Sequence, residues 1–517
     1  MVKSLIPLFT LTLAGAASLV SSALLSETEA QSGETAPISR LVIEGDRQTF
    51  EIMTEAEIEQ ELNDAWARTF LLQGQRPADG REIAQLFRLF EEEADSAKAF
   101  KRRAFLVSED AVFVRLEHER IDEVPFRAVI HWLRGREDDV FLSVPAGQRS
   151  ENLELIAWDP KKEAFNFYRG FRGRWRWMGD SNWALAPNTR GHECFECHVN
   201  GHMVMKEQNQ PWNNWRSQQT SFPKISARIR TTELTRDNLA SGEELESIMK
   251  GTIPRLNRAR IKALRQLPAS SDQAQAVLVQ LLTTTTANLD SSLEKSRPLN
   301  QETFRLQLSF FIDPSLHKAL GTPSLDTEIH YESFQAAIER HGFKLVDPGL
   351  GIEEPGDTFF AFLSPAPPLE SNDLLAKLQR AGILSGRFFI ACLMVDFPNP
   401  VFSDRRKALL DAMLPVLEGE TRPLGPDVEQ GLVEAAIGVA ESQQPSSRPV
   451  DQRSPHQQFA FYWRLGEAAA KEKAKEAVTA YYRNLEARMK TPEGVEDWVR
   501  LMAASGEAVS PAGLKLS

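Results

Sequence analysis

The chain has 517 residues, of which 42% are hydrophobic and 26% charged. This composition is typical of a globular protein with a substantial core, and the length suggests roughly three domains. The net charge of −12 argues against nucleic acid as the main partner. The three cysteines are too few for a disulfide scaffold, which a chain of this size does not need.

The N-terminal segment has the layout of a secretory signal. Lys3 gives a positive start, residues 5–25 are mostly apolar, and small residues offer cleavage after Ala23 or Ala30. We therefore expect residues 1–30 to be removed and the mature protein to be soluble in a bacterial periplasm. The alternative is an uncleaved anchor, because the apolar stretch is nearly long enough to span a bilayer. Only in that case do we expect association with a membrane.

Two of the cysteines form a C-x-x-C-H pattern with the histidine that follows them. The residues are Cys194, Cys197 and His198, and this spacing is the attachment signature of c-type haem. Residues three and four apart share one face of a helical turn. Both thiols can therefore form thioethers with the vinyl groups of one porphyrin, while the imidazole binds its iron.

Three other interpretations use the same residues. A thioredoxin-like redox pair needs a βαβ context and leaves His198 without a role. A structural disulfide between Cys194 and Cys197 has the same weakness. A zinc site that adds His202 has suitable ligand types, but zinc folds usually separate the cysteine pair from the histidine pair by a dozen or more residues. The complete pattern therefore favours haem.

Residues 194–198 resemble the haem-binding segment of c-type cytochromes. Residues 205–207 and 211–215 add a similarity to large single-haem bacterial members of that class. The resemblance implies one covalent haem c, with His198 as the proximal iron ligand, and electron transfer. Small members of the class are compact helical domains, whereas this motif lies deep inside a long chain, so the resemblance does not extend to their fold.

The segment before the motif predicts an antiparallel meander. Residues 153–158, 164–169 and 174–178 are expected strands, separated by turns rich in Asp, Pro, Lys and Gly. Six of the ten tryptophans fall between positions 158 and 215.

The last of these strands carries two kinds of side chain. Trp175 and Trp177 share one face, while Arg174 and Arg176 share the other. The aromatic face could contact a porphyrin, and the arginines could pair with its propionates. An ordinary aromatic core face with a solvated basic face explains the same pattern more simply.

The remaining segments predict an α+β protein. Its antiparallel N-terminal part leads into a central haem segment, which a mostly helical C-terminal part with a few buried strands follows. The expected parts are 1–30 (signal), 31–180 (α+β), 181–235 (haem c-binding), 236–345 (mainly helical), 346–440 (α/β) and 441–517 (linker and helices).

Several elements can be placed within these parts. We expect helices in residues 51–105, a strand at 111–117, and helices over 241–285 that Pro254 and Pro268 interrupt. We also expect a capping box of Ser241 and Glu244, buried strands at 359–363 and 388–395, a polar linker over 441–457, and one long helix over 459–489 with a Glu467–Lys471 pair. Cys392 falls in the second apolar run and is expected to be an inert core thiol.

The sixth ligand of the iron stays open. Met203 and Met205 follow His198 so closely that packing on the proximal side is the better interpretation. Met249 falls on an apolar helical stripe and is better explained as core. The histidines carry no stronger signal: His192 and His202 are too near, and His317 and His456 are far from the motif. A five-coordinate iron is a further alternative.

Two classes of function fit these observations. In the first, the haem passes single electrons to periplasmic redox partner proteins. In the second, an open iron site activates peroxide, oxygen or a small nitrogen or sulfur compound; a haem-based sensor or binding protein fits equally well. The size of the chain favours catalysis or specialised docking, but the sequence offers no distal acid–base pair and no second C-x-x-C-H. We therefore prefer electron transfer and leave enzymatic activity open.

Overall fold

The computed structural model describes most of the chain after residue 36. The described residues are 37–45, 47–93, 98–108, 126–145, 152–186, 188–189, 192–198, 200–203, 239–240, 242–283, 288–291, 302–308, 316, 319–322, 325–341, 344–347, 352–355, 363–366, 369–398 and 403–503. The predicted signal segment, the predicted strand at 111–117 and residues 205–215 lie outside them. Residues 36–517 form one compact unit.

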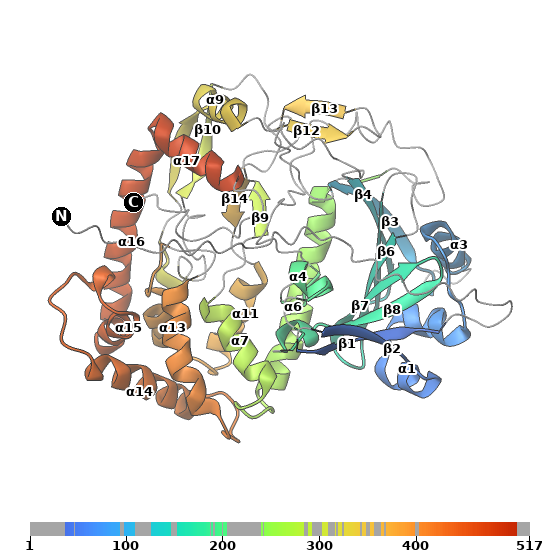
Figure 1. Ribbon diagram of the computed structural model, residues 1–517, viewed down its shortest axis with the longest axis horizontal. Coiled ribbons are helices and arrows are strands. Elements are labelled where there is room, and N and C mark those ends of the chain that lie inside the picture. The colour runs from blue at the N-terminus through green and yellow to red at the C-terminus, as the bar shows by residue number, and fades with distance from the viewer. Residues whose placement is uncertain are drawn as a thin grey trace, which may run out of the picture. The chain divides into compact units, whose positions relative to one another are not determined.

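An eight-stranded sheet occupies the N-terminal part, with strand order β2-β1-β8-β7-β6-β5-β4-β3 (Figure 1). The strands are β1 (Ser39–Glu44), β2 (Arg47–Ile52), β3 (Lys101–Ser108), β4 (Phe126–Arg134), β5 (Asp138–Pro145), β6 (Asn152–Asp159), β7 (Ala164–Phe171) and β8 (Arg174–Asp180). Neighbours pair antiparallel, except that β1 runs parallel to β8. The predicted meander over residues 153–178 is therefore confirmed.

Three short helices and a 3-10 turn pack on one face of the sheet, which we call the aromatic face. They are α1 (Glu55–Glu61), α2 (Ala65–Thr69), α3 (Gly80–Glu91) and η1 (Leu71–Gln73). Side-chain caps begin each α-helix; Thr54, for example, forms a capping box with Glu57. Trp175 and Trp177 both pack into this core, and the Trp175 ring lies 4.8 Å from that of Trp66.

The opposite face carries the C-x-x-C-H segment, and we call it the motif face. Its core joins alternate strand residues such as Phe167 and Met178 to Phe195 of the motif and to Met249 of α6 (Gly242–Leu264). A β-strand points successive side chains to opposite faces. Strands β3 to β8 therefore each contribute residues to the aromatic core on one face and to the core of the motif face on the other.

The C-terminal part is mostly helical, as predicted. It contains α7 (Asp272–Thr283), α9 (Tyr331–His341), α11 (Leu369–Arg380), α12 (Gly386–Leu393), α13 (Asp404–Met413), α14 (Pro426–Ser442), α15 (Pro455–Arg464), α16 (Glu467–Met489) and α17 (Pro492–Ala503). Three two-stranded antiparallel sheets accompany them: β9 (Asn288–Ser291) with β14 (Leu363–Ala366), β10 (Thr303–Gln307) with β11 (Asp326–His330), and β12 (Lys344–Asp347) with β13 (Ile352–Pro355). Short 3-10 turns, η2 (Trp183–Leu185), η4 (Leu414–Leu417) and η5 (Val450–Gln452), complete the described elements.

Three predicted elements differ from the structure. Residues 388–395 lie mainly in helix α12, not in a strand, and the Ser385 hydroxyl caps its start by accepting from Phe388 N. A short apolar run does not distinguish a buried strand from a buried helix. Pro254 lies inside α6 instead of ending it. The expected single helix over 459–489 is divided between α15 and α16 by Gly466, whose φ of 77° only glycine adopts easily.

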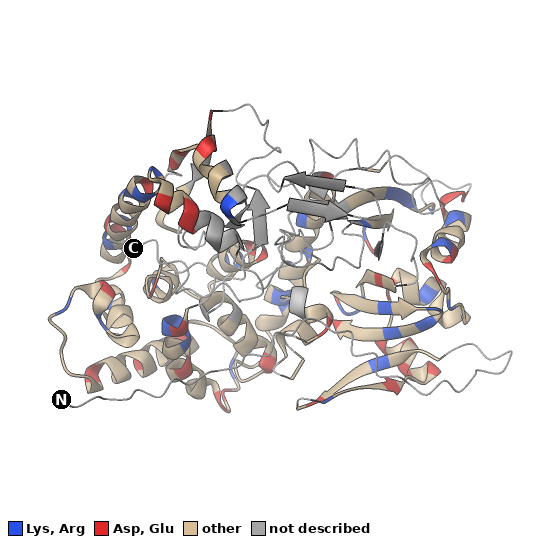
Figure 2. Cartoon of the chain, turned by 45° about the horizontal axis from the view of Figure 1, so that its top comes forward, with Lys and Arg blue, Asp and Glu red and all other residues tan. Residues whose placement is uncertain are grey.

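Some of the remaining predictions concern described residues and can be compared with the structure, whereas others lie outside them. Pro268 does separate α6 from α7, and Cys392 is fully buried as predicted. Ser241 and residues 359–362 lie outside the described residues. Within the described part, no helix is long and apolar enough to cross a membrane. Acidic and basic residues are interspersed over both the sheet and the helices (Figure 2).

Candidate functional site

The C-x-x-C-H segment forms a single helical turn on the motif face. Helix α4 (Cys194–Cys197) contains both cysteines, and His198 closes it by donating its backbone N–H to the Cys194 carbonyl at 2.9 Å. Phe195 is fully buried and packs edge-on against Phe167, with ring centroids 5.3 Å apart. The second residue of the motif thus anchors the turn to strand β7.

His198 has the geometry of a metal-ligating imidazole. Its Nδ1 atom donates to the backbone carbonyl of His202 at 2.8 Å, and its ring lies 5.2 Å from that of Phe167. Burial lowers its pKa, which favours the neutral form that binds metals. Among the described residues nothing bonds its Nε2 atom. A histidine that donates Nδ1–H to a carbonyl and keeps Nε2 for a metal is the usual arrangement.

Cys194 is a free, partly buried thiol. Burial raises its pKa to about 12, against the opposing effect of Arg169. Reactive cysteines in redox and nucleophilic sites have lowered pKa values instead, so this environment speaks against a thioredoxin-like role. The side chain of Cys197 lies outside the described part of the structure.

The zinc interpretation requires the His202 ring to turn toward the cysteines. The Nε2 atom of His202 instead lies 3.2 Å from Oδ1 of Asn257 in helix α6, and the residue is buried. Among the described residues, no group of three or more His, Cys, Asp and Glu side chains could hold a metal ion. The His202 side chain is thus part of the packing that supports the motif.

A row of charged side chains crosses the motif face beside Cys194. Glu154 and Arg169 are cross-strand partners on β6 and β7. Arg169 pairs with Glu154 at 3.5 Å and with Glu193, the residue before Cys194, at 2.6 Å. Arg127 pairs with the other oxygen of Glu154 at 3.4 Å. These arginines, Arg127 first, hold the pKa of Glu154 below its usual range. The amino-acid sequence alone does not indicate this row, because strand register decides which side chains meet.

The structure separates the tryptophans from the arginines of β8 as the alternation predicted. Arg176 is the cross-strand partner of Arg169, so it lies on the motif face, where its guanidinium covers the Phe50 ring at 3.9 Å. Trp175 and Trp177 lie on the aromatic face, away from the motif. The suggested contact of these two tryptophans with a porphyrin is therefore wrong, and they are core residues.

Two of the three methionines considered as sixth ligands pack in the core of the motif face. Met203 is fully buried and Met249 is 6% exposed, as the sequence pattern indicated. His456 is buried in α15. Met205 and His317 lie outside the residues that the structure describes. The sixth ligand therefore stays a prediction without a named residue.

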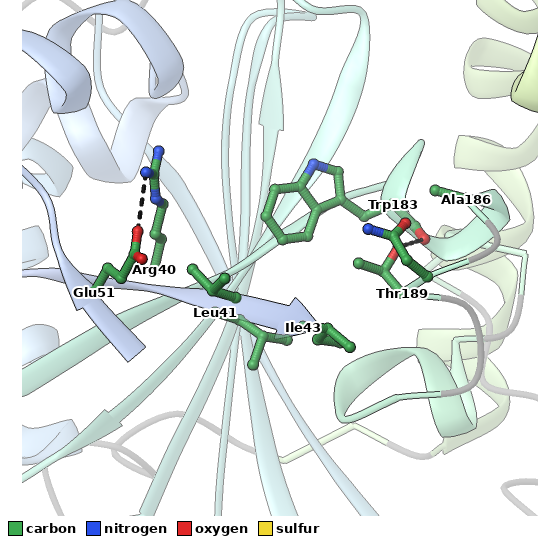
Figure 3. A pocket seen from close by; sticks show the side chains of 9 residues that line it. Arg40, Leu41, Ile43, Glu51, Trp183, Ala186 and Thr189 are labelled. Carbon is green, nitrogen blue, oxygen red and sulfur yellow. Dashed lines mark hydrogen bonds and ion pairs between the residues drawn. The ribbon is translucent and has the colours of Figure 1, made fainter. Parts of the chain in front are cut away.

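A cavity of about 380 Å³ lies near the chain that approaches the motif, between β1 and η2 (Figure 3). Its lining comprises Arg40, Leu41, Val42, Ile43, Glu51, Trp183, Ala186, Asn188 and Thr189. Arg40 and Glu51 form an ion pair at 3.1 Å. Among the described side chains, none from the C-x-x-C-H turn lines this cavity. His192, two residues before Cys194, is bonded at Nδ1 by the Gln48 amide at 3.0 Å.

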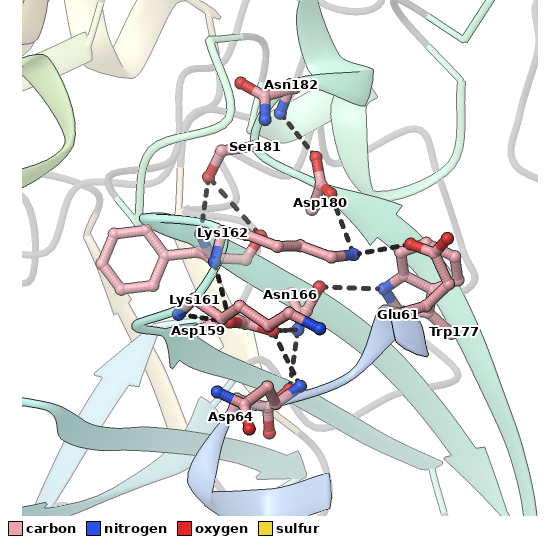
Figure 4. A network of polar contacts seen from close by, with 12 residues as sticks. Glu61, Asp64, Asp159, Lys161, Lys162, Asn166, Trp177, Asp180, Ser181 and Asn182 are labelled. Carbon is pink, nitrogen blue, oxygen red and sulfur yellow. Dashed lines mark hydrogen bonds and ion pairs between the residues drawn. The ribbon is translucent and has the colours of Figure 1, made fainter. Parts of the chain in front are cut away.

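A buried polar network supports the strands from the aromatic side (Figure 4). The Asn166 amide donates to Asp64 at 2.7 Å and to Asp159 at 3.2 Å, and its oxygen accepts from Trp177 Nε1 at 3.2 Å. The Tyr168 hydroxyl also donates to Asp64. Because burial outweighs these bonds, the pKa of Asp64 rises to about 6. This network belongs to the scaffold, since the sheet lies between it and the motif.

Comparison with protein-family models, with curated proteins and with solved structures finds no match to this chain.

Proposed function

We propose that this chain is a periplasmic c-type cytochrome that carries one haem and transfers single electrons between partner proteins. Cys194 and Cys197 would hold the haem through thioethers, and Nε2 of His198 would bind its iron. The observation that carries the proposal is the bond from His198 Nδ1 to the His202 carbonyl. It fixes the tautomer that presents Nε2 to a metal, in a residue that directly follows Cys197 and lies one helical turn after Cys194.

The residues around the motif fit a haem in two further respects. The His198 imidazole is held neutral by burial, and Cys194 is a protonated, free thiol that is available for thioether formation. Arg169 lies beside Cys194, on the same face as Arg176. Guanidinium groups pair readily with carboxylates such as haem propionates. When bound, haem iron would supply the one-electron redox chemistry, and this chain would supply its ligand, its electrostatics and its shielding from water.

The charges beside the motif favour electron transfer over peroxide or oxygen activation. A general acid or base needs a pKa near the working pH. Glu154 has the opposite property, because the arginines beside it lower its pKa. Glu193 is likewise engaged by Arg169. Glu154 is therefore suited to holding charge in place and poorly suited to moving protons.

The test is expression of the full chain for export in a host that matures c-type haem. We expect denatured protein to keep one haem per chain, read from its mass and its pyridine haemochrome spectrum. Cys194→Ala and Cys197→Ala should each lose one of the two thioethers, and the double variant should lose covalent haem. Cys392→Ala, which alters a buried thiol distant from the motif in sequence, is the matched control and should keep it. Colourless, exported wild-type protein would refute the proposal.

A further inference from the structure

The loop that follows His198 is held by a clamp from helix α6. Its described residues are 200–203, of which Asn200, His202 and Met203 are almost fully buried. Gly201 N donates to the His198 carbonyl at 2.7 Å, which closes a tight turn directly after the motif. The carbonyl that accepts from His198 Nδ1 is therefore presented by a short segment whose position depends on what packs against it.

Asn257 of α6 provides the first contact of the clamp. Its Oδ1 atom meets His202 Nε2 at 3.2 Å, and its side chain is fully buried. Its amide nitrogen donates to the Glu370 carbonyl at 2.9 Å and to the Asp373 carboxylate at 3.0 Å, both in α11. The amide orientation is thus fixed by α11, and Oδ1 is left to face His202.

Arg260, almost one turn further along α6, provides the second contact. Its guanidinium donates to the backbone carbonyls of Asn200 and Ser181, and it is only 3% exposed. The Ser181 hydroxyl in turn donates to the Gly201 carbonyl at 2.7 Å. A buried cation that bonds two backbone carbonyls is costly to move, because each carbonyl would lose a charge-assisted bond.

We infer that Asn257 and Arg260 are positioning residues that set the donor strength of His198 toward the iron. The inference rests on the proposed function. Anchoring His202 keeps its carbonyl 2.8 Å from His198 Nδ1, and a strong bond at Nδ1 makes the imidazole a better electron donor at Nε2. Better donation stabilises ferric over ferrous iron and lowers the reduction potential. The hydrogen bonds from His198 to His202 and on to Asn257 continue to Asp373 of α11. Helix α11 therefore also contributes to the orientation of the His198 imidazole.

The experiment compares reduction potentials of haem-loaded variants by potentiometric titration. Asn257→Leu, which is similar in size but cannot hydrogen-bond, should raise the potential. We expect a change of about tenfold in the reduction equilibrium constant, or about 59 mV for one electron. Thr252→Val is the matched control, because Thr252 is also buried in α6 but its hydroxyl donates only to the Met249 carbonyl of its own helix. It should leave the potential unchanged.

A second pair of variants keeps the inference testable if one protein folds poorly. His202→Phe retains a ring and removes the bond to Asn257, so it should raise the potential by the same amount. The bond between His202 and Asn257 is lost in both single variants, so the double variant should show no further rise beyond that of Asn257→Leu, which also removes the two bonds to α11. Arg260→Met should raise the potential as well.

Two failures can be told apart. If wild-type protein carries no covalent haem, the proposed function itself is wrong. The inference alone is wrong if the wild-type protein carries haem but Asn257→Leu and His202→Phe leave the reduction potential unchanged. It is also wrong if Thr252→Val shifts the reduction potential by the same amount.

Discussion

The guanidinium of Arg169 donates to the Oε2 atom of Glu193 at 2.6 Å and so ties strand β7 to the residue directly before Cys194. Glu193 has φ 52° and ψ −121°, a conformation that L-residues rarely adopt. Such strain persists only where surrounding contacts enforce it. The ion pair, together with the buried Phe195, thus holds the start of the C-x-x-C-H turn in place.

Arg169→Gln should therefore destabilise the chain around the motif. The Arg169 side chain is 43% exposed, so solvent screening limits the expected loss to about 1 kcal/mol of unfolding free energy. Denaturant titration of the haem-free protein measures it. Arg174→Gln, on the neighbouring strand and exposed, is the control and should change stability by less. Equal losses in the two variants would show that the pair contributes nothing specific.

Gly201→Ala should destabilise the loop after His198 by more than the cost of a positive φ for alanine. Gly201 has φ 65°, and an added Cβ would lie 2.3 Å from the Ser181 carbonyl oxygen. Overpacking of this kind costs about 1–3 kcal/mol beyond the cost of a positive φ. Both the melting temperature and the fraction of chains with attached haem should fall.

Gly382→Ala separates these two costs. Gly382 has nearly the same φ, 66°, but nothing lies within 4 Å of an added Cβ. The Gly382→Ala variant should lose about 1 kcal/mol of unfolding free energy, which is the cost of a positive φ for alanine. If the two variants were equally stable and equally loaded with haem, the close approach of Gly201 to Ser181 would have no energetic consequence.

Electron transfer and catalysis differ in how the reduced iron should respond to carbon monoxide. A carrier keeps six ligands on its iron and so excludes added ligands, whereas an enzyme leaves a position open. We expect the dithionite-reduced protein to be low-spin, with a visible spectrum that carbon monoxide does not change. A rapid spectral change at stoichiometric carbon monoxide would favour the enzymatic or sensory alternative.

The alternation of apolar and polar residues predicted the fold correctly where the alternation is clear. The strands over residues 153–178 alternate clearly and are separated by turn residues, so their positions and facing were readable. The run at 388–395 was not, because a buried helix and a buried strand are both apolar throughout. Pro254 inside α6 shows the same limit, since tertiary packing on both sides of a helix can outweigh the loss of one backbone bond.

The candidate site divides in a similar way. Cys194, Cys197 and His198 are adjacent in sequence, so their spacing alone indicates haem chemistry. Arg169 and Asn257 join the site only through strand register and through the packing of α6, and neither is local information. The one available signal for Asn257 is its neighbour Leu256 in a helix that buries both, because a polar residue on a buried helix face needs a partner.

The stability of the sheet should depend on pH through Asp64. Burial raises its pKa in the folded chain to about 6, whereas an unfolded aspartate titrates near 3.9. Between these values the folded chain holds the proton more tightly, so the free energy of unfolding should fall as the pH rises from about 4 to about 6. The shift of about 2 pKa units corresponds to about 3 kcal/mol, and above pH 6 this contribution stays level.

Asp64→Asn tests this dependence, because asparagine still accepts from Ala67 N as the cap of α2 but does not titrate. Urea titrations at several pH values should give a flatter profile between pH 4 and pH 6 than the wild type. Asp79→Asn changes the equivalent cap of α3, whose carboxylate accepts from Arg81 N and Glu82 N outside the buried network. It should keep the wild-type profile. If Asp64→Asn retained the full slope, the proton would reside elsewhere in the network that Asp64 shares with Asn166 and Tyr168.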